Sequence, residues 1–314
     1  MGEAFKTIGH DQPKTWLANA VRGGRVNGSY LFLGPSGIGK SAVAREFAAA
    51  LLCESPAEGH ACGVCGQCGR VARGLHPNVR TFEKPSDKAF FPVELVREIC
   101  GASSLSRVEP GFRIFIVDDA DRFNDSSANA FLKTLEEPPE GTVFILLAAS
   151  GAQMHETIVS RCQAVRFSAL TSEQVAAAVS SVEGIPADAK LRRALIDASA
   201  GSPGRVVKML ESGAPEAAAD FAGRAIDDPF GAAEQLVGEV SKEADNEARR
   251  EAPRDVVGLL LVELRRQLAD QVAEGGTPGK VVSAVRRLDQ LRERIDGNVN
   301  LKLCCDSLAL AWPG

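Results

Sequence analysis

The chain has 314 residues, of which 45% are hydrophobic and 25% charged, and its formal net charge is −5. These values are typical of a globular protein with two or three domains, and they exclude disordered, collagen-like and disulfide-scaffold classes. No apolar run approaches the roughly 18 residues of a membrane span, and the N-terminal residues lack the apolar stretch of a secretory signal. The negative charge and the scarcity of aromatic side chains, with one Tyr and two Trp, argue against a free-standing DNA-coating protein.

The first half of the chain alternates between helical and strand-like patterns. Hydrophobic spacing and capping residues predict helices over 13–22, 41–52, 92–107 and 124–137. Short apolar runs predict buried strands over 30–33, 113–117, 142–148 and 164–167. Strands that alternate with helices predict an α/β fold with a parallel sheet that is covered on both faces.

Strand signals stop after residue 167. Short helices are predicted over 172–181, 188–200 and 203–211, and the strongest amphipathic helices over 259–272 and 280–295. This layout predicts a three-part chain: an α/β domain over 1–167 with a cysteine-rich module inserted at 53–80, a small helical domain over 168–212, and an all-α domain over 213–314.

The last domain is expected to carry oligomerisation, because its helices have apolar stripes that a small helical domain cannot wholly bury alone. The alternative is that the two stripes close on each other in one monomeric bundle. The stripe residues are Leu259, Leu260, Leu264, Leu268, Val281, Val285, Leu288 and Leu291.

Four of the eight cysteines lie within sixteen residues, with the spacing C-x8-C-x2-C-x2-C. Zinc prefers four tetrahedral thiolate or imidazole ligands, and a C-x2-C turn presents two sulfurs to one ion. We therefore predict a structural Zn²⁺ site, in which His60 or His76 could replace one cysteine. Reduced surface thiols and a redox site are the alternatives. The remaining cysteines are expected to be buried and reduced; they are Cys100, Cys162, Cys304 and Cys305. The predicted zinc ligands are Cys53, Cys62, Cys65 and Cys68.

Residues 34–41 read GPSGIGKS and match the phosphate-loop pattern G-x-x-x-x-G-K-[ST]. The string lies between a predicted strand and a predicted helix, as this loop requires. Its glycines allow backbone N–H groups to close around phosphate oxygens, the lysine can reach the β- and γ-phosphates of ATP or ADP, and the serine hydroxyl can ligate Mg²⁺. A glycine-rich turn without a ligand is the alternative. The predicted nucleotide-binding residues are Gly34, Gly37, Gly39, Lys40 and Ser41.

The predicted strand at 113–117 ends in two acids, which is the Walker B layout. Asp118 is placed to hold the Mg²⁺ together with Ser41. Hydrolytic P-loop proteins usually carry glutamate at the next position, where it orients the attacking water. Asp119 is one methylene shorter, so nucleotide binding is expected here and efficient hydrolysis is not.

Several further strings complete a resemblance to the clamp-loader branch of the AAA+ proteins, which includes the delta-prime and gamma/tau subunits of bacterial DNA polymerase III. The resemblance covers nearly the whole chain, and the four-cysteine insertion is one of its marks. The other matching segments are FKTIGHDQ at 5–12, GLHPN at 74–78 with Asn in place of the family's Asp, ANAFLKTLEEPP at 128–139, SRC at 160–162, GSPGR at 201–205 and NVNLKL at 298–303.

The resemblance implies roles for three more residues. Arg161 of the SRC string is expected to act as an arginine finger, which stabilises charge on the γ-phosphate bound by a neighbouring subunit. A surface arginine paired with an acid such as Glu156 is the alternative. Ser150 occupies the sensor 1 region, where the family usually has Thr or Asn, and Arg205 occupies the sensor 2 region.

Two departures favour a delta-prime type of subunit over the gamma/tau ATPase. Asp119 and Ser150 both weaken the hydrolytic positions, and gamma/tau chains usually continue beyond the point where this one stops, at Gly314. Weak or absent ATP hydrolysis by the chain alone and no polymerase chemistry are therefore expected. The alternatives are a gamma/tau-type ATPase, an independent zinc-containing AAA+ remodeller, and a P-loop protein retained as a scaffold.

The resemblance also implies an assembly. A hetero-pentamer with gamma/tau and delta subunits is expected, which uses ATP to open a sliding clamp and place it on primed DNA. The expected cofactors are ATP or ADP, Mg²⁺ and Zn²⁺, and the expected location is the cytoplasm.

Overall fold

The computed structural model describes residues 6–105, 109–225, 227–228, 230–232, 248–274, 279–296, 307 and 310. The chain divides into two compact units, Met1–Gln174 and Val175–Gly314, each of which is described by itself. Phe5, Cys304, Cys305 and the string at 298–303 lie outside the described residues, as do the last two residues of the helix predicted at 92–107. No helix in the described ranges is long and apolar enough to cross a membrane.

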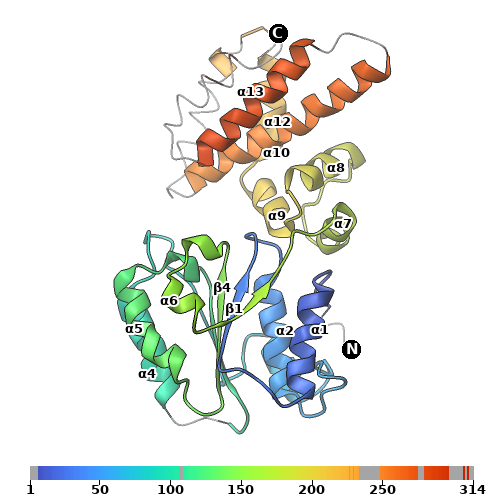
Figure 1. Cartoon of the computed structure of the whole chain (residues 1–314). Coiled ribbons are helices and arrows are strands. Elements are labelled where there is room, and N and C mark those ends of the chain that lie inside the picture. Colours follow the sequence, from blue (N-terminus) through green and yellow to red (C-terminus); the bar gives the residue numbers. More distant parts are fainter. Residues whose placement is uncertain are drawn as a thin grey trace. The chain divides into compact units, whose positions relative to one another are not determined.

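A five-stranded, wholly parallel sheet forms the centre of the first unit (Figure 1). Its strands are β1 (Ser29–Leu33), β2 (Val79–Phe82), β3 (Arg113–Val117), β4 (Thr142–Ala148) and β5 (Gln163–Arg166), in the order β2-β3-β4-β1-β5. Every residue of β1 and β4 is buried, as expected for central strands of a sheet with both faces covered. The predicted α/β fold with a parallel sheet is confirmed.

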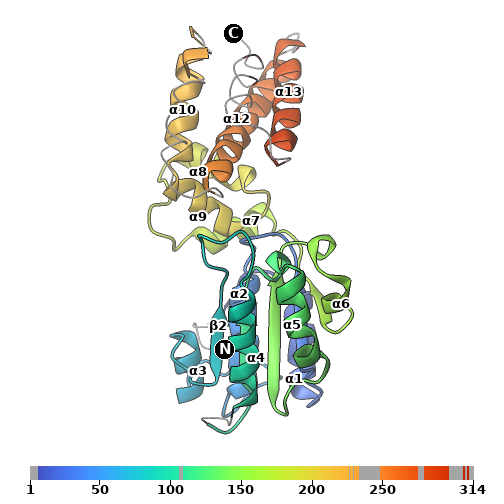
Figure 2. The ribbon, with the colours of Figure 1, turned by 90° about the vertical axis from the view of Figure 1, so that its left-hand side faces the viewer.

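Helices cover both faces of this sheet (Figures 1 and 2). One face carries α1 (Asp11–Arg22), α2 (Lys40–Leu52) and α3 (Gly66–Ala72). The opposite face carries α4 (Val93–Ser104), α5 (Asp125–Glu136) and the short α6 (Glu156–Val159). The helix α5 begins where predicted, because Asn124 and Ser127 form a reciprocal capping box.

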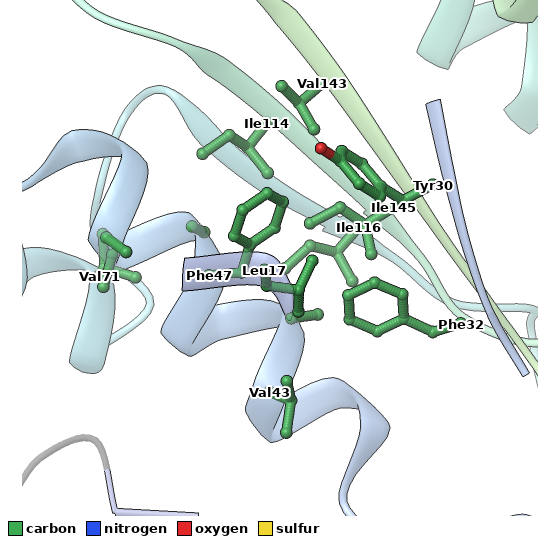
Figure 3. Packing of buried hydrophobic residues seen from close by; sticks show 14 of the residues in the cluster. Leu17, Tyr30, Phe32, Val43, Phe47, Val71, Ile114, Ile116, Val143 and Ile145 are labelled. Carbon is green, nitrogen blue, oxygen red and sulfur yellow. The ribbon is translucent and has the colours of Figure 1, made fainter. Parts of the chain in front are cut away.

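The two faces are built from alternate residues of the same strands, since successive side chains of a strand point to opposite sides. Tyr30, Phe32 and Ile145 pack toward α1 and α2, where they meet Leu17 and Phe47 (Figure 3). The intervening residues of β1, β3 and β4 pack on α4 and α5. Each fully buried side chain of this size contributes about 1.5–3 kcal/mol, so this core holds the ends of the strands firmly in place.

The strand β2 and the helix α3 are among the elements of this unit that were not predicted. The strand β2 lies at the edge of the sheet, and of its four residues only Phe82 is buried, so it gives no apolar run. The helix α3 has the sequence GQCGRVA, whose glycines disfavour a helix. It is capped at its start by Cys65, whose sulfur accepts a hydrogen bond from the backbone N–H of Cys68.

The second unit is helical in its described residues. Its helices are the end of α7 (Ser172–Val179), α8 (Ala189–Ala198), α9 (Pro203–Glu211), α10 (Ala214–Arg224), α12 (Ala248–Ala273) and α13 (Gly279–Asp296). The helices α8 and α9 begin where predicted, because the side chains of Asp188 and Ser202 cap their N-termini. The division of the chain into three domains stays a prediction.

The apolar stripes of α12 and α13 are mostly buried within the single chain. Leu259, Leu260 and Leu264 of α12 are buried, as are Leu288 and Leu291 of α13, and the two helices pack against each other. The alternative, in which the stripes close on each other, therefore accounts for most of these side chains, because two long helices side by side cover each other's apolar faces. Two of the stripe residues are only half-buried, and oligomerisation through this part of the chain stays a prediction.

Candidate functional site

The phosphate loop at 34–41 joins β1 to the first turn of α2, and its backbone needs glycine at three points. Gly37 and Gly39 have φ values of 72° and 104°, which L side chains rarely adopt. Gly34 has no room for a side chain, because a Cβ atom would overlap the carbonyl oxygen of Phe167. The sequence therefore forms a tight loop between the carboxyl end of β1 and the N-terminus of α2.

Lys40 lies inside this loop and is only 8% exposed. Its Nζ donates hydrogen bonds to the carbonyl oxygens of Gly34 (2.6 Å) and Pro35 (2.8 Å). Burial lowers the pKa of Lys40, while the charges of Asp118, Asp121 and Asp119, in decreasing order, raise it. The lysine thus faces a group of acids from the end of β3, as the predicted arrangement requires.

The N-terminal segment that carries part of the resemblance supports the loop through His10, a residue to which the sequence assigned no role of its own. Nε2 of His10 donates a hydrogen bond to the carbonyl oxygen of Ile38 (2.7 Å). His10 is buried, has a φ of 57°, and meets the ring of Phe167 edge-on at 5.1 Å. The backbone of Thr7, three residues before His10, is held by two charged side chains, because Glu46 accepts from its N–H and Lys14 donates to its carbonyl oxygen.

The acids after β3 have three different environments. Asp118 is half-buried, and its Oδ1 accepts a hydrogen bond from the backbone N–H of Asp119 (2.9 Å). Asp119 is exposed and has a φ of 53°, at the start of a short 3₁₀ turn. Asp121 was missed by the sequence analysis, and its Oδ2 accepts from the backbone N–H of Ala149 (2.9 Å), which ties this turn to the end of β4.

The residues expected to serve hydrolysis are held by local contacts. The Ser150 side chain accepts a hydrogen bond from the backbone N–H of Ala152 (3.3 Å) and caps a 3₁₀ turn. Arg161 lies on the surface of the unit, and its Nε donates to Oε2 of Glu136 at the end of α5 (3.3 Å). Its NH1 donates to the carbonyl oxygen of Thr157 (3.1 Å). The acid that pairs with Arg161 is thus Glu136, not the predicted alternative Glu156.

Arg205 belongs to the second unit. Its Nε donates to Oδ1 of Asp255 over 2.8 Å, and both side chains are largely buried. The pair joins the first turn of α9 to α12. A role of Arg205 toward nucleotide stays a prediction.

The four predicted zinc ligands meet at one point. The Sγ atoms of Cys53, Cys62, Cys65 and Cys68 all lie within 4.8 Å of one another, and two of the Sγ–Sγ distances are 3.9 and 4.0 Å. Tetrahedral Zn–S bonds of about 2.3 Å place sulfurs about 3.8 Å apart, so the cluster fits a zinc ion. His60 and His76 are not part of the group, and the cysteines are free rather than disulfide-bonded.

Backbone N–H groups point at these sulfurs, as they do at thiolate ligands. The N–H of Cys62 donates to Sγ of Cys53, that of Cys65 to Sγ of Cys62, and that of Cys68 to Sγ of Cys65. Hydrogen bonds from the N–H groups of Val64 and Cys65 lower the pKa of Cys62 to about 6. Burial raises the pKa of Cys68, the innermost of the four. The site therefore favours at least one thiolate near neutral pH before a metal binds.

His76 instead supports the cysteine-rich module through hydrogen bonds. Its Nδ1 accepts from the backbone N–H of Asn78 (3.1 Å), so Nε2 carries the proton and donates to Oε1 of Gln67 (2.6 Å). Arg70 donates to both Gln67 and Glu109. This network joins α3 to the start of β2 and to the turn before β3.

The fold and the loop define an α/β protein of the P-loop class, and the comparisons place it within that class. The family described as "DNA polymerase III, delta subunit" matches residues 9–171, just over half of the chain, and the chain belongs to this family. The DNA polymerase III subunit delta' of Pseudomonas aeruginosa is 38% identical over 134 residues, which are 43% of this chain and 41% of that protein. Subunit tau of Escherichia coli is 33% identical over 168 residues, 54% of this chain and 26% of tau.

The matches to these relatives thus span about a quarter to two fifths of the relatives' length. Among solved structures, a DNA polymerase III gamma subunit-related protein from Thermotoga maritima superimposes with a TM-score of 0.44 at 17% identity. That superposition covers 94% of this chain and 98% of the other.

Proposed function

We propose that the chain binds ATP or ADP with Mg²⁺ at the phosphate loop. The proposal rests on the position of Lys40. This lysine is buried inside a loop with the phosphate-binding sequence, and the acids that follow β3 lie near it. Phosphate oxygens can take over the hydrogen bonds that the lysine now donates to the loop carbonyls. The backbone N–H groups at the start of α2 add the positive end of the helix dipole.

Ser41 and Asp118 are the residues that would hold Mg²⁺. Oxygen ligands suit this ion, and the two residues follow the loop and β3 respectively, as in other P-loop proteins. When bound, Mg²⁺ supplies charge neutralisation between the β- and γ-phosphates. Asp119 is the doubtful water-positioning residue, because its side chain is short and exposed.

We infer that the four cysteines hold a structural Zn²⁺ ion. The sulfur spacing and the N–H···S hydrogen bonds support this. A structural zinc contributes folding free energy directly, so a chelator is expected to loosen residues 53–80 while the sheet stays folded. Less than half a zinc per chain in reduced, freshly purified protein would contradict the assignment.

In the cell we propose a clamp-loader subunit of the delta-prime type, in the cytoplasm, that assembles with gamma/tau and delta subunits and helps to load a sliding clamp onto primed DNA. Membership of the family supports this role, as do the relatives that are DNA polymerase III subunits. The weakened positions Asp119 and Ser150 support the delta-prime type over a gamma/tau ATPase. In this role Arg161 acts on nucleotide bound by a neighbouring subunit.

Three measurements test the proposal. Calorimetric titration of the isolated chain with Mg-ADP and Mg-ATP should show one site per chain, and the chain alone should hydrolyse ATP slowly or not at all. Affinity purification from the native cytoplasm should return distinct clamp-loader subunits. Brisk hydrolysis by the isolated chain would favour a gamma/tau-type ATPase, and self-assembly into homo-hexamers would favour an independent remodeller.

A further inference from the structure

The phosphate loop and the cysteine cluster lie at opposite ends of one helix. The helix α2 begins at Lys40, inside the loop, and ends at Leu52, so that Cys53 is its capping residue. Thirteen residues at 1.5 Å each place the two sites about 20 Å apart. The rigid element that carries the lysine therefore also carries the first of the four sulfurs.

The helix α1 lies beside α2 and joins the same two sites (Figure 1). At its start, His10 donates its hydrogen bond to the carbonyl oxygen of Ile38 in the phosphate loop. Farther along, the carbonyl oxygen of Ala18 lies against Gly59 of the cysteine module, so closely that a Cβ on Gly59 would overlap it. At its end, Arg22 forms an ion pair with Glu58 (3.0 Å).

Between these contacts α1 packs on α2 through Leu17 and Phe47. A pocket of about 230 Å³, open to solvent, lies beside this packing and is lined by both helices and by Gly59 of the cysteine module. Side chains that line an open pocket lack packing partners on that side. The contacts at the two ends of α1 therefore add to the packing that fixes its position.

The contact at Gly59 is tied to the cysteines. Gly59 lies in a turn closed by two backbone hydrogen bonds between Ala57 and His60. This segment runs from Cys53 to Cys62, and the backbone N–H of Cys62 donates to Sγ of Cys53. A metal bound to both sulfurs fixes the two ends of the segment, and so the place of Gly59 against α1.

We propose that His10 and Gly59 are positioning residues that link the cysteine site to the phosphate loop through α1, so that the zinc-loaded chain binds nucleotide more tightly than the zinc-free chain. The proposal rests on the nucleotide and zinc sites proposed above. Coupling between sites is reciprocal, so bound nucleotide must also raise the affinity of the cysteines for zinc by the same factor.

The test compares the affinity of the full chain for Mg-ADP with zinc bound and after its removal by a chelator. Couplings of this kind are typically about 5–150-fold, and we expect a loss of at least about 5-fold on removal. Gly59→Ala keeps all four sulfur ligands but forces the turn away from Ala18, so it should weaken Mg-ADP binding with zinc still bound. Gly69→Ala is the matched control, because it lies in the same module with nothing within 4 Å of the new Cβ, and should leave the affinity unchanged.

A second measurement uses only the loaded protein, in case zinc removal unfolds the module. The rate at which zinc passes to a coloured chelator should fall when Mg-ADP is added, because a more tightly bound ion dissociates less often. His10→Ala, at the other end of α1, should abolish this protection, because it removes the hydrogen bond to the loop without touching the module.

The proposal is overturned if the Mg-ADP affinity is the same with and without zinc, or if the rate of zinc release is unchanged by Mg-ADP. Absence of Mg-ADP binding in the loaded chain instead overturns the proposed function, so the two failures are distinguishable. A Gly59→Ala protein that retains zinc and wild-type Mg-ADP affinity would show that α1 is not the link.

Discussion

The phosphate loop and the residues expected to serve hydrolysis differ in what holds them. In the loop, positive-φ glycines and the buried hydrogen bonds of Lys40 and His10 fix the backbone. Among the hydrolytic positions, Asp119 is exposed, Ser150 caps a turn, and Arg161 is paired with Glu136 on the surface. This difference supports the proposal that the chain binds a nucleotide and does not by itself cleave it efficiently.

Catalysis demands the stricter geometry. Reacting groups must be held within a fraction of an ångström, since misplacement by about 1 Å can cost 100-fold in rate, whereas phosphate binding tolerates an adaptable lysine. The Nε and NH1 groups of Arg161 donate to residues of its own chain, while the side chain lies at the surface. An arginine in this position is suited to act across an interface. The following variants test each half of the comparison.

The largest effect is expected at Arg161. In complexes assembled with Arg161→Ala, turnover at the neighbouring subunit's site should fall about 10³–10⁵-fold, as it does when other P-loop proteins lose an arginine finger. Arg161→Lys should be nearly as damaging, because an ammonium group lacks the planar fork. The measurement is DNA- and clamp-stimulated ATP hydrolysis, with assembly and nucleotide binding by this chain unchanged. Arg25→Ala, which removes an exposed arginine elsewhere on the chain, is the control. If stimulated turnover survives Arg161→Ala, Arg161 has only a structural role.

The next largest effect is expected inside the loop. Lys40→Ala removes the charge that would face the β-phosphate of ADP and should weaken Mg-ADP binding by about 100-fold, near the upper end for a charge-assisted hydrogen bond. Calorimetric titration measures it, and Lys88→Ala, an exposed lysine beside Asp87, is the matched control. Retained affinity in Lys40→Ala would mean that the loop does not bind phosphate.

A smaller effect is expected at Asp121, whose hydrogen bond joins the turn after β3 to the end of β4. Asp121→Ala leaves the backbone N–H of Ala149 without its acceptor and should lower the free energy of unfolding by about 1–2 kcal/mol. Asp121→Asn keeps a carbonyl oxygen and should lose less. Chemical denaturation measures both, with Asp87→Ala as an exposed control. Equal losses for Ala and Asn would assign the effect to charge instead of to the hydrogen bond.

The features that the sequence predicted are those with a local pattern. The central strands appear as apolar runs, and the loop and the cysteines appear as fixed spacings of glycine, lysine and sulfur. The edge strand β2 was missed because only Phe82 of its four residues is buried, and α3 because its glycines oppose a helix that the cysteine cluster supports.

The missed site residues have contacts that no local pattern encodes. His10 meets Ile38 across 28 positions, and Asp121 meets Ala149 across 28 positions, so each contact exists only once the sheet has brought two loops together. The partner of Arg161 was mistaken for the same reason. Glu156 is nearer in sequence, but the end of α5 brings Glu136 to the arginine across 25 positions.

The smallest effect is expected at His76, where a buried polar network, like that of the loop, fixes the chain without binding a substrate. Burial and, after it, the charge of Arg70 lower the pKa of His76, against an opposing contribution from Glu109. A histidine with a lowered pKa binds fewer protons in the folded than in the unfolded chain. Its contribution to stability is therefore complete above the ordinary pKa of 6.5 and is lost as the pH falls from there through the lowered value.

Protonation would also place a hydrogen on Nδ1, which now accepts from the N–H of Asn78, so the charged ring loses that bond. His76→Gln stays neutral, and its free energy of unfolding should fall less steeply than that of the wild type between pH 7.5 and pH 5.5. Denaturation of both proteins across this range, with zinc content checked at each pH, measures the difference. The cysteines are the same in both proteins, so their titration cancels in the comparison. Parallel curves would mean that His76 can be protonated in place, and that this network, unlike the phosphate loop, does not depend on one fixed set of hydrogen bonds.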